Sequence, residues 1–271
     1  TPSVSITSTL PSFVTASSFS PAGIAIAFTL ANTSGSPTDV IMVDVVASSD
    51  TNYDDSDSSL ASAADASTFC LGATDFTLPI TTCVFTWNST TISDGTKYVI
   101  VHAVNGSDYT SGASNAFMVD QTAPTGTIAI TSPTPAGNFT NSLTPTLTIT
   151  GTPNGGSDIV SGTISIDSSV TNFPLTFSSN TTTYSVPSGA LSAGQTASVS
   201  ISLTDGAGNA TSSPITYSFI VDQAAPTLGS FSNIVTYTND KTPSLSFSAN
   251  DASGVGGMKL LLKCSGDSSY S

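Results

Sequence analysis

The stretch Phe117-Met118-Val119-Asp120-Gln121-Thr122-Ala123-Pro124-Thr125 occurs again as Phe219-Ile220-Val221-Asp222-Gln223-Ala224-Ala225-Pro226-Thr227. The two copies lie 102 residues apart, which is about the length of one β-sandwich. In each copy, alternating apolar residues run into Asp-Gln and then a proline, a pattern that predicts a last strand followed by a short, stiff linker. The repeat therefore predicts tandem β-sandwich domains.

The composition favours β-structure along the whole chain. All 18 acidic residues are Asp and all 4 basic residues are Lys, so the good helix formers Glu and Arg are absent. Ser and Thr make up about a third of the residues and suit turns and strands, and the 38% of hydrophobic residues can fill cores. We therefore expect an all-β fold of Greek-key sandwiches.

The net charge excludes two classes of partner. A formal charge of −14 and a pI near 4.1 argue against nucleic acid and anionic membrane surfaces, because both require Lys or Arg. The longest apolar run, Ile24–Ala31, is far shorter than the ~20 residues of a membrane-spanning helix, so we expect a buried strand and no membrane insertion in this segment. Since the chain begins at Thr1 rather than Met, we expect a processed chain or an excerpt of a longer one.

The cysteines predict one disulfide. Cys70 and Cys83 enclose twelve residues, a loop of the size that disulfides often close, and two separate buried thiols are the alternative. This spacing is not that of a zinc site, and a single His gives such a site little support. Cys264 is left over: it is a buried free thiol, or its partner lies beyond residue 271 or on another chain.

The repeat divides the chain into a divergent sandwich at 1–121, a second sandwich at 122–223 and the first half of a third at 224–271. In the first, the Asp- and Ser-rich segment Ser48–Ala66 is predicted to be a surface loop or edge excursion rather than core. The strands predicted for the two complete domains are Ser3–Thr7, Gly23–Ala31, Asp39–Ala47, Cys83–Trp87, Tyr98–Val104 and Ala116–Asp120, then Thr127–Thr131, Thr144–Thr150, Gly162–Asp167, Thr183–Val186, Ala197–Thr204 and Ile215–Asp222.

The third unit covers about half of the repeat. It begins like the second domain, since Tyr237–Pro243 matches Phe139–Pro145, and it offers strands near Pro243–Ser248 and Met258–Cys264. Half a sandwich cannot bury its apolar face. We therefore expect either that the chain continues or that another molecule completes the sheet by adding strands to its exposed edge.

Three motifs resemble those of bacterial Ig-like repeat domains in large prokaryotic cell-surface proteins. They are the aromatic-Thr-Asn-x-x-Thr-Pro opening of the second and third units, the turn Thr204–Asn209, and the closing Val-Asp-Gln-x-Ala-Pro. The resemblance implies tandem Ig-like Greek-key sandwiches in extracellular stalks, adhesins or fibre subunits, and it implies no catalysis. The first domain shares only the closing motif, and its Cys pair and Asp-rich segment would suit a specialised head.

No cluster of residues predicts catalysis. His102 lies in the apolar stretch Tyr98–Val104 with no Ser or Cys motif beside it, so we expect a structural histidine. No pair of carboxylates stands on a strand flanked by aromatic sugar platforms, and Trp87 is the single Trp. We therefore expect the chain not to be an enzyme.

The segment Asp50–Asp57 is the sharpest candidate for a metal site, because oxygen ligands at alternate positions of a loop suit Ca²⁺. The ligands it offers are Asp50, Asn52, Asp54 and Asp57. It departs from an EF-hand loop, with Asp55 where the turn needs Gly and Ala61 where a bidentate Glu is expected, so a solvated acidic loop is the alternative. Asp120 and Asp222 are a second calcium position, since related repeats can be stiffened by metal at domain junctions; turn capping is the simpler explanation.

Six sequons offer glycosylation sites, at Asn32, Asn88, Asn105, Asn138, Asn180 and Asn209. Chance gives roughly five in a chain of this composition, so the count alone proves nothing. In a secreted chain, sugars there would compensate for a surface with few charges. Lys-Asn isopeptide staples normally need a buried acid, and with Glu absent we do not expect Lys97 or Lys241 to form one.

Together these features favour a structural protein, made of tandem Ig-like sandwiches in an extracellular filament or cell-surface stalk. Self-association into a fibre by strand exchange is one means of assembly. The alternative is an adhesin or glycan-binding module, in which the first domain and its Asp50–Asp57 loop contact host or neighbour-cell glycans.

Overall fold

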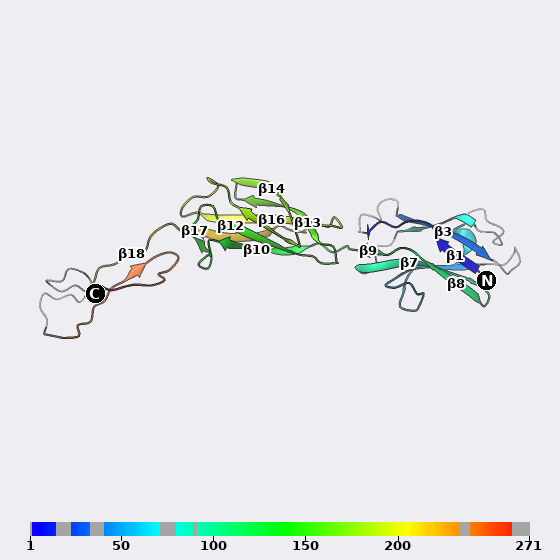
Figure 1. Cartoon of the computed structure of the whole chain (residues 1–271), viewed down its shortest axis with the longest axis horizontal. Coiled ribbons are helices and arrows are strands. Elements are labelled where there is room, and N and C mark those ends of the chain that lie inside the picture. The colour runs from blue at the N-terminus through cyan, green and yellow to red at the C-terminus, as the bar shows by residue number, and fades with distance from the viewer. Residues whose placement is uncertain are drawn as a thin grey trace.

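The structure is a computed structural model that describes residues 2–14, 23–32, 41–70, 80–88, 91–232 and 239–261. These residues form strands and one short 3-10 helix, η2 (Ala66–Thr68), and contain no α-helix. Two sandwiches follow one another along the longest axis, and the last strands of the chain lie beyond the second (Figure 1). The predicted all-β sandwich fold is confirmed.

The first sandwich consists of two sheets. One has the strand order β1-β3-β6; the other has the order β2-β9-β7-β4-β5, with β8 paired to the later part of the long strand β7. All pairs are antiparallel except β2 with β9. The strands are β1 (Pro2–Ile6), β2 (Phe13–Val14), β3 (Ile24–Asn32), β4 (Met42–Ser48), β5 (Ser58–Asp65), β6 (Ile80–Trp87), β7 (Gly95–Asn105), β8 (Asp108–Ala113) and β9 (Phe117–Val119).

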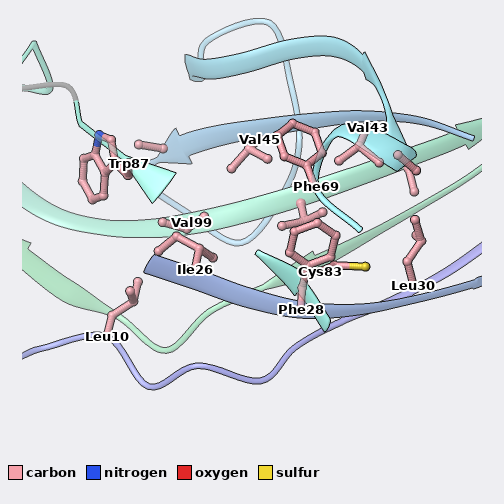
Figure 2. Packing of buried hydrophobic residues seen from close by; sticks show 14 of the residues in the cluster. Leu10, Ile26, Phe28, Leu30, Val43, Val45, Phe69, Cys83, Trp87 and Val99 are labelled. Carbon is pink, nitrogen blue, oxygen red and sulfur yellow. The ribbon is translucent and has the colours of Figure 1, made fainter. Parts of the chain in front are cut away.

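Alternating residues of β3 form the centre of the first core. Phe28 and Leu30 point to the same side of the strand, and neither is exposed. The ring of Phe69 packs edge-on against that of Phe28, with centroids 6.3 Å apart, and Cys83 lies beside Phe28 (Figure 2). Cys70 and Cys83 form a disulfide, which ties the segment after η2 to β6.

The Asp-rich insertion contributes more to the fold than the sequence suggests. Its second half is the edge strand β5, which pairs with β4. β5 lies at the edge of its sheet, as the prediction of an edge excursion allows. Leu60, Ala61 and Ala64 of this strand pack against the core, so the expectation that the segment is not part of the core is wrong here. Small Ala and Ser side chains weaken the apolar alternation by which strands are recognised, while an edge position demands little burial of them.

The second sandwich repeats this plan. Its sheets have the orders β10-β12-β15 and β11-β17-β16-β13-β14. The short strand β11 pairs in parallel with the last strand β17, as β2 does with β9 in the first sandwich. The strands are β10 (Thr125–Ser132), β11 (Phe139–Thr140), β12 (Thr146–Thr152), β13 (Ile159–Ile166), β14 (Val170–Thr176), β15 (Thr181–Ser185), β16 (Thr196–Asp205) and β17 (Ile215–Val221).

The two cores are separate clusters of buried side chains. The first spans Leu10–Val119 and the second spans Ile128–Val221. In the second, alternation along β12 buries Leu147 and Ile149 completely. Each cluster lies inside one of the two complete domains predicted from the repeat, whose boundaries stay a prediction.

The third unit differs most from expectation. Its described residues form two strands of two residues, β18 (Thr227–Leu228) and β19 (Ala249–Asn250), which pair with each other. The strands predicted near Pro243–Ser248 and Met258–Cys264 are absent from the described residues, apart from one isolated bridge at Ser246; positions 262–264, including Cys264, lie outside them. A strand needs a neighbour to pair with, and the described part of this unit supplies few.

In the described ranges, no helix is long and apolar enough to cross a membrane.

Candidate functional site

The first domain junction is built around a buried carboxylate. Asp120 follows β9 and is fully buried. Its Oδ2 accepts hydrogen bonds from the backbone N of Ser157, at 3.0 Å, and from the Ser157 hydroxyl. Its Oδ1 accepts one from Nδ2 of Asn209 at 3.1 Å and one from the backbone N of Thr122 at 3.2 Å. One side chain from the end of the first domain therefore binds two loops of the second.

The linker itself is held from the side of the first domain. Oδ1 of Asp94 accepts a hydrogen bond from the backbone N of Gln121 at 2.9 Å, and Oδ2 accepts one from the hydroxyl of Thr122. The side-chain amide of Gln121 donates to the carbonyl of Ile92 at 2.9 Å. On the other side, Asn154 Nδ2 donates to the carbonyl of Ala123 at 3.1 Å. The linker is thus fixed by hydrogen bonds as well as by its proline.

The turn that resembles the family motif closes this junction. Asn209 donates from its backbone N to Asp205 Oδ1 at 2.8 Å and from Nδ2 to Asp205 Oδ2 at 3.1 Å. The same Nδ2 reaches the backbone carbonyl of Asp120 at 3.1 Å. Gly155 is required beside it, because its φ is +95° and a Cβ there would lie 2.3 Å from Asp120 Oδ1. The sequence identified Asp120 and this turn, but not Asp94 or Ser157.

The second junction repeats only part of this network. Asp222 donates from its backbone N to the carbonyl of Thr140 at 2.8 Å, and its Oδ1 accepts from the backbone N of Ala224 at 3.0 Å. Gln223 Nε2 donates to the carbonyl of Asn141 at 3.1 Å. Oδ2 of Asp222 is buried and accepts no hydrogen bond from the described residues. The side chains of Asp222 and Asp251 lie near enough to interact.

The predicted calcium ligands of the Asp-rich loop are turned toward their own backbone. Asp50 Oδ1 accepts from the N of Asn52 at 2.7 Å, and Asp57 Oδ2 accepts from the N of Asp54 at 2.9 Å. Asp54 Oδ1 accepts from Ser56, whose hydroxyl and backbone hydrogen bonds lower the pKa of Asp54. Within the described ranges, no three His, Cys, Asp or Glu side chains are grouped so that they could hold a metal ion.

The same loop folds back onto the outer face of the larger sheet. The ring of Tyr53 stacks on that of His102, with centroids 3.9 Å apart and planes 4° from parallel. Tyr53 Oη donates to Asp44 Oδ2 at 3.0 Å, and Nδ1 of His102 lies 2.7 Å from Ser111 Oγ. Asp44, His102 and Ser111 are register partners on β4, β7 and β8, so one row across three strands supports the Tyr53 ring.

Burial sets the protonation states of this row. It lowers the pKa of His102, against the opposing effect of the Asp44 carboxylate, so the imidazole is uncharged at neutral pH. Burial, followed by the hydrogen bond to Asp44, raises the pKa of the Tyr53 phenol, which stays protonated and donates. His102 makes the structural contacts expected of it and also lines a surface pocket.

Two of the predicted glycosylation sites carry structural hydrogen bonds. Nδ2 of Asn209 is the donor in the junction, and Nδ2 of Asn180 donates to Asp158 at 2.9 Å. A sugar attached to either nitrogen would disturb those bonds. Asn88 and Asn138 are exposed, whereas the side chain of Asn32 lies outside the described residues. Glycosylation at these sequons stays a prediction.

No family model and no curated protein matches the chain. Similar solved structures include one of a 1.5-MDa bacterial ice-binding adhesin, studied for host cell surface retention (16% identity, TM-score 0.42, covering 86% of this chain and 69% of that one). A tetra-tandem repeat in the extending region of a large adhesion protein shares 16% identity at a TM-score of 0.29, over 92% of this chain and 62% of that one. A Salmonella alpha-2-macroglobulin mutant shares 10% identity at a TM-score of 0.25, over 84% of this chain and 15% of that one. Two of these three are adhesion proteins.

Proposed function

We propose that this chain is a structural segment of a cell-surface stalk or extracellular filament, built from tandem Ig-like sandwiches. The observation that carries the proposal is the junction at Asp120, where the linker accepts or donates hydrogen bonds on both sides. Domains joined by a free linker would move independently, whereas a buried, bonded carboxylate resists bending. A rigid series of domains suits a spacer, and we assign it no catalytic step.

The proposed stalk function also explains why the chain has few charged residues other than Asp. A stalk needs solubility and resistance to extension rather than a binding cleft, and a net charge of −14 keeps neighbouring copies apart. Assembly would then require a local apolar contact. The third unit offers one, with Leu228, Phe231 and Met258 exposed at 76%, 48% and 57%.

Small-angle scattering of the purified chain tests this proposal. We expect a rod, with a radius of gyration well above the roughly 18 Å of a compact chain of this length, and a cross-section that does not change with salt. Antibody labelling of the source cells should place the chain outside the membrane. A compact particle, or a flexible chain whose two sandwiches reorient freely, would contradict the rigid-stalk proposal.

We also propose that calcium binds at the second junction and stiffens it. Asp222 Oδ2 is buried without a hydrogen bond from the described residues, and Asp251 brings a second carboxylate beside it. Asn141, Thr140 and Ser253 line the same pocket, of about 290 Å³. Oxygen ligands and two like charges favour a divalent cation there. In the Asp50–Asp57 loop, where calcium remains a second proposal, the carboxylates already accept backbone hydrogen bonds.

Thermal unfolding with EDTA and with added calcium tests whether calcium binds at the second junction. Calcium at about a hundred times its Kd should stabilise the chain by about 2.7 kcal/mol, and Asp222→Asn should abolish that gain. Asp50→Asn is the matched control, since it removes one carboxylate charge from the other candidate loop. A calcium effect that persists in Asp222→Asn but disappears in Asp50→Asn would assign the ion to the loop instead.

A further inference from the structure

The outer face of the first sandwich carries a pocket that the stalk function does not use. It has a volume of about 510 Å³ and is lined by Thr51, Asn52, Tyr53, His102, Tyr109 and Ser111. These residues come from the loop after β4, from β7 and from β8. Two strands and a returning loop thus contribute to one surface pocket, and small-molecule sites are usually concave.

Aromatic rings dominate this surface. Tyr109 is 70% exposed, the highest value among the exposed large hydrophobic aromatics of the described residues, and its ring centroid lies 5.7 Å from that of His102. Tyr53, 38% exposed, stacks on the same imidazole. Exposing two tyrosines beside one pocket forgoes the stability that their burial would provide. Tyrosine presents both an apolar face and a hydroxyl, which suits an amphipathic ligand.

The pocket is organised before any ligand arrives. The Tyr53 ring is fixed at one end by its hydrogen bond to Asp44 and along one face by His102, which is held by Ser111. The short Asx turns of the loop, at Asp50 and Asp54, fix the backbone on either side of Tyr53. A ring that is already immobile loses little entropy on binding, so even a small contact area can bind measurably.

The charge of the surroundings restricts the ligand. The Tyr53 side of the pocket lies in the field of the carboxylates of Asp44, Asp57 and Asp55, and the His102 imidazole is uncharged at neutral pH because burial lowers its pKa. Phosphate, sulfate and carboxylate groups would be repelled there. A neutral ligand with one apolar face and several hydroxyls fits best, since Asn52, Thr51 and Ser111 offer polar groups beside the rings.

We propose that this pocket is a binding subsite for neutral hexopyranose glycans, in which a sugar ring stacks on Tyr109 and Tyr53 and its hydroxyls bond to Asn52 and Ser111. The first sandwich is then a head that binds sugar as well as a segment of the stalk. The proposal is independent of the rigid junction, so either can fail without the other.

The test uses the whole 271-residue chain. The chain is applied to an array of neutral and acidic glycans, and the neutral glycans it retains are followed by NMR titration with methyl glycosides of glucose, galactose and mannose. We expect retention on neutral glycans with weak, millimolar affinity for single sugars. Tyr109→Ala should weaken binding roughly tenfold or more, and Tyr109→Phe, which keeps the ring, should stay within about threefold.

Phe173→Ala is the matched control, because Phe173 is 49% exposed on the second sandwich and lies beside Tyr184. It should leave binding unchanged. Tyr109 is mostly in solvent, so its replacement should leave the unfolding transition unchanged as well. The proposal is overturned by retention on acidic glycans alone, by no retention on any neutral glycan, by binding that survives Tyr109→Ala, or by an equal loss in Phe173→Ala.

Discussion

Asp120→Ala will lower the free energy of unfolding by roughly 3–5 kcal/mol and let the two sandwiches move relative to each other. The variant leaves the backbone N and hydroxyl of Ser157 without their acceptor, and each orphaned donor costs about 1–3 kcal/mol. Asn209 loses one of its bonds but keeps those to the Asp120 carbonyl and to Asp205. Ser157 is itself buried, so water reaches it poorly. Urea unfolding in the presence of EDTA measures the loss, and small-angle scattering measures the added motion.

Two variants serve as controls for this prediction. Asp120→Asn keeps one acceptor oxygen but replaces the other with an amide NH2, which donates and cannot accept, so we expect an intermediate loss. Asp222→Ala removes the repeat counterpart, whose Oδ2 accepts no hydrogen bond from the described residues, and should cost less. An Asp120→Ala chain with unchanged unfolding and unchanged scattering would show that the junction does not hold the domains.

The repeated closing motif predicted β-sandwiches correctly, because an alternating last strand and a proline linker are local features of the chain. The domain boundaries that it predicts stay a prediction. The two edge strands β5 and β8 were not predicted, since Ser58–Asp65 and Asp108–Ala113 have weak apolar alternation and gain their order from pairing with β4 and β7. The strands predicted for the third unit are absent from its described residues for the opposite reason. Its alternation is strong, yet the described residues supply too few pairing partners.

The functional surfaces were harder to predict than the fold. Asp120 could be identified because it lies in a repeat, whereas Ser157 reaches it across 37 residues of sequence. Asp94 binds the linker at Gln121 and Thr122, across 27 and 28 residues. The Tyr53–Tyr109 pocket depends on a loop that returns over the sheet, and no spacing rule relates two tyrosines 56 residues apart. One signal was available: a tyrosine within an acidic loop is unusual enough to invite a search for its contact.

Leu147→Ala will destabilise the second sandwich by about 2–5 kcal/mol, whereas Leu245→Ala will change the stability of the isolated chain by less than about 0.5 kcal/mol. The two leucines occupy equivalent places, since Thr144-Pro145-Thr146-Leu147 corresponds to Thr242-Pro243-Ser244-Leu245. Leu147 is fully buried, while Leu245 is 37% exposed. Calorimetry of the two variants measures the difference, because each sandwich has its own core and should unfold as its own unit.

The same pair of variants tests assembly by strand exchange. If strands of a second copy cover the third unit, Leu245 becomes buried in the assembly, and Leu245→Ala should shift self-association to higher concentration by roughly tenfold or more. Analytical ultracentrifugation over a range of concentrations measures that shift, with Phe173→Ala as the exposed control on another surface. Self-association that is equal in wild type and Leu245→Ala, or a chain that stays monomeric at every concentration, would argue against strand exchange. The apolar face of the third unit would then need a different cover.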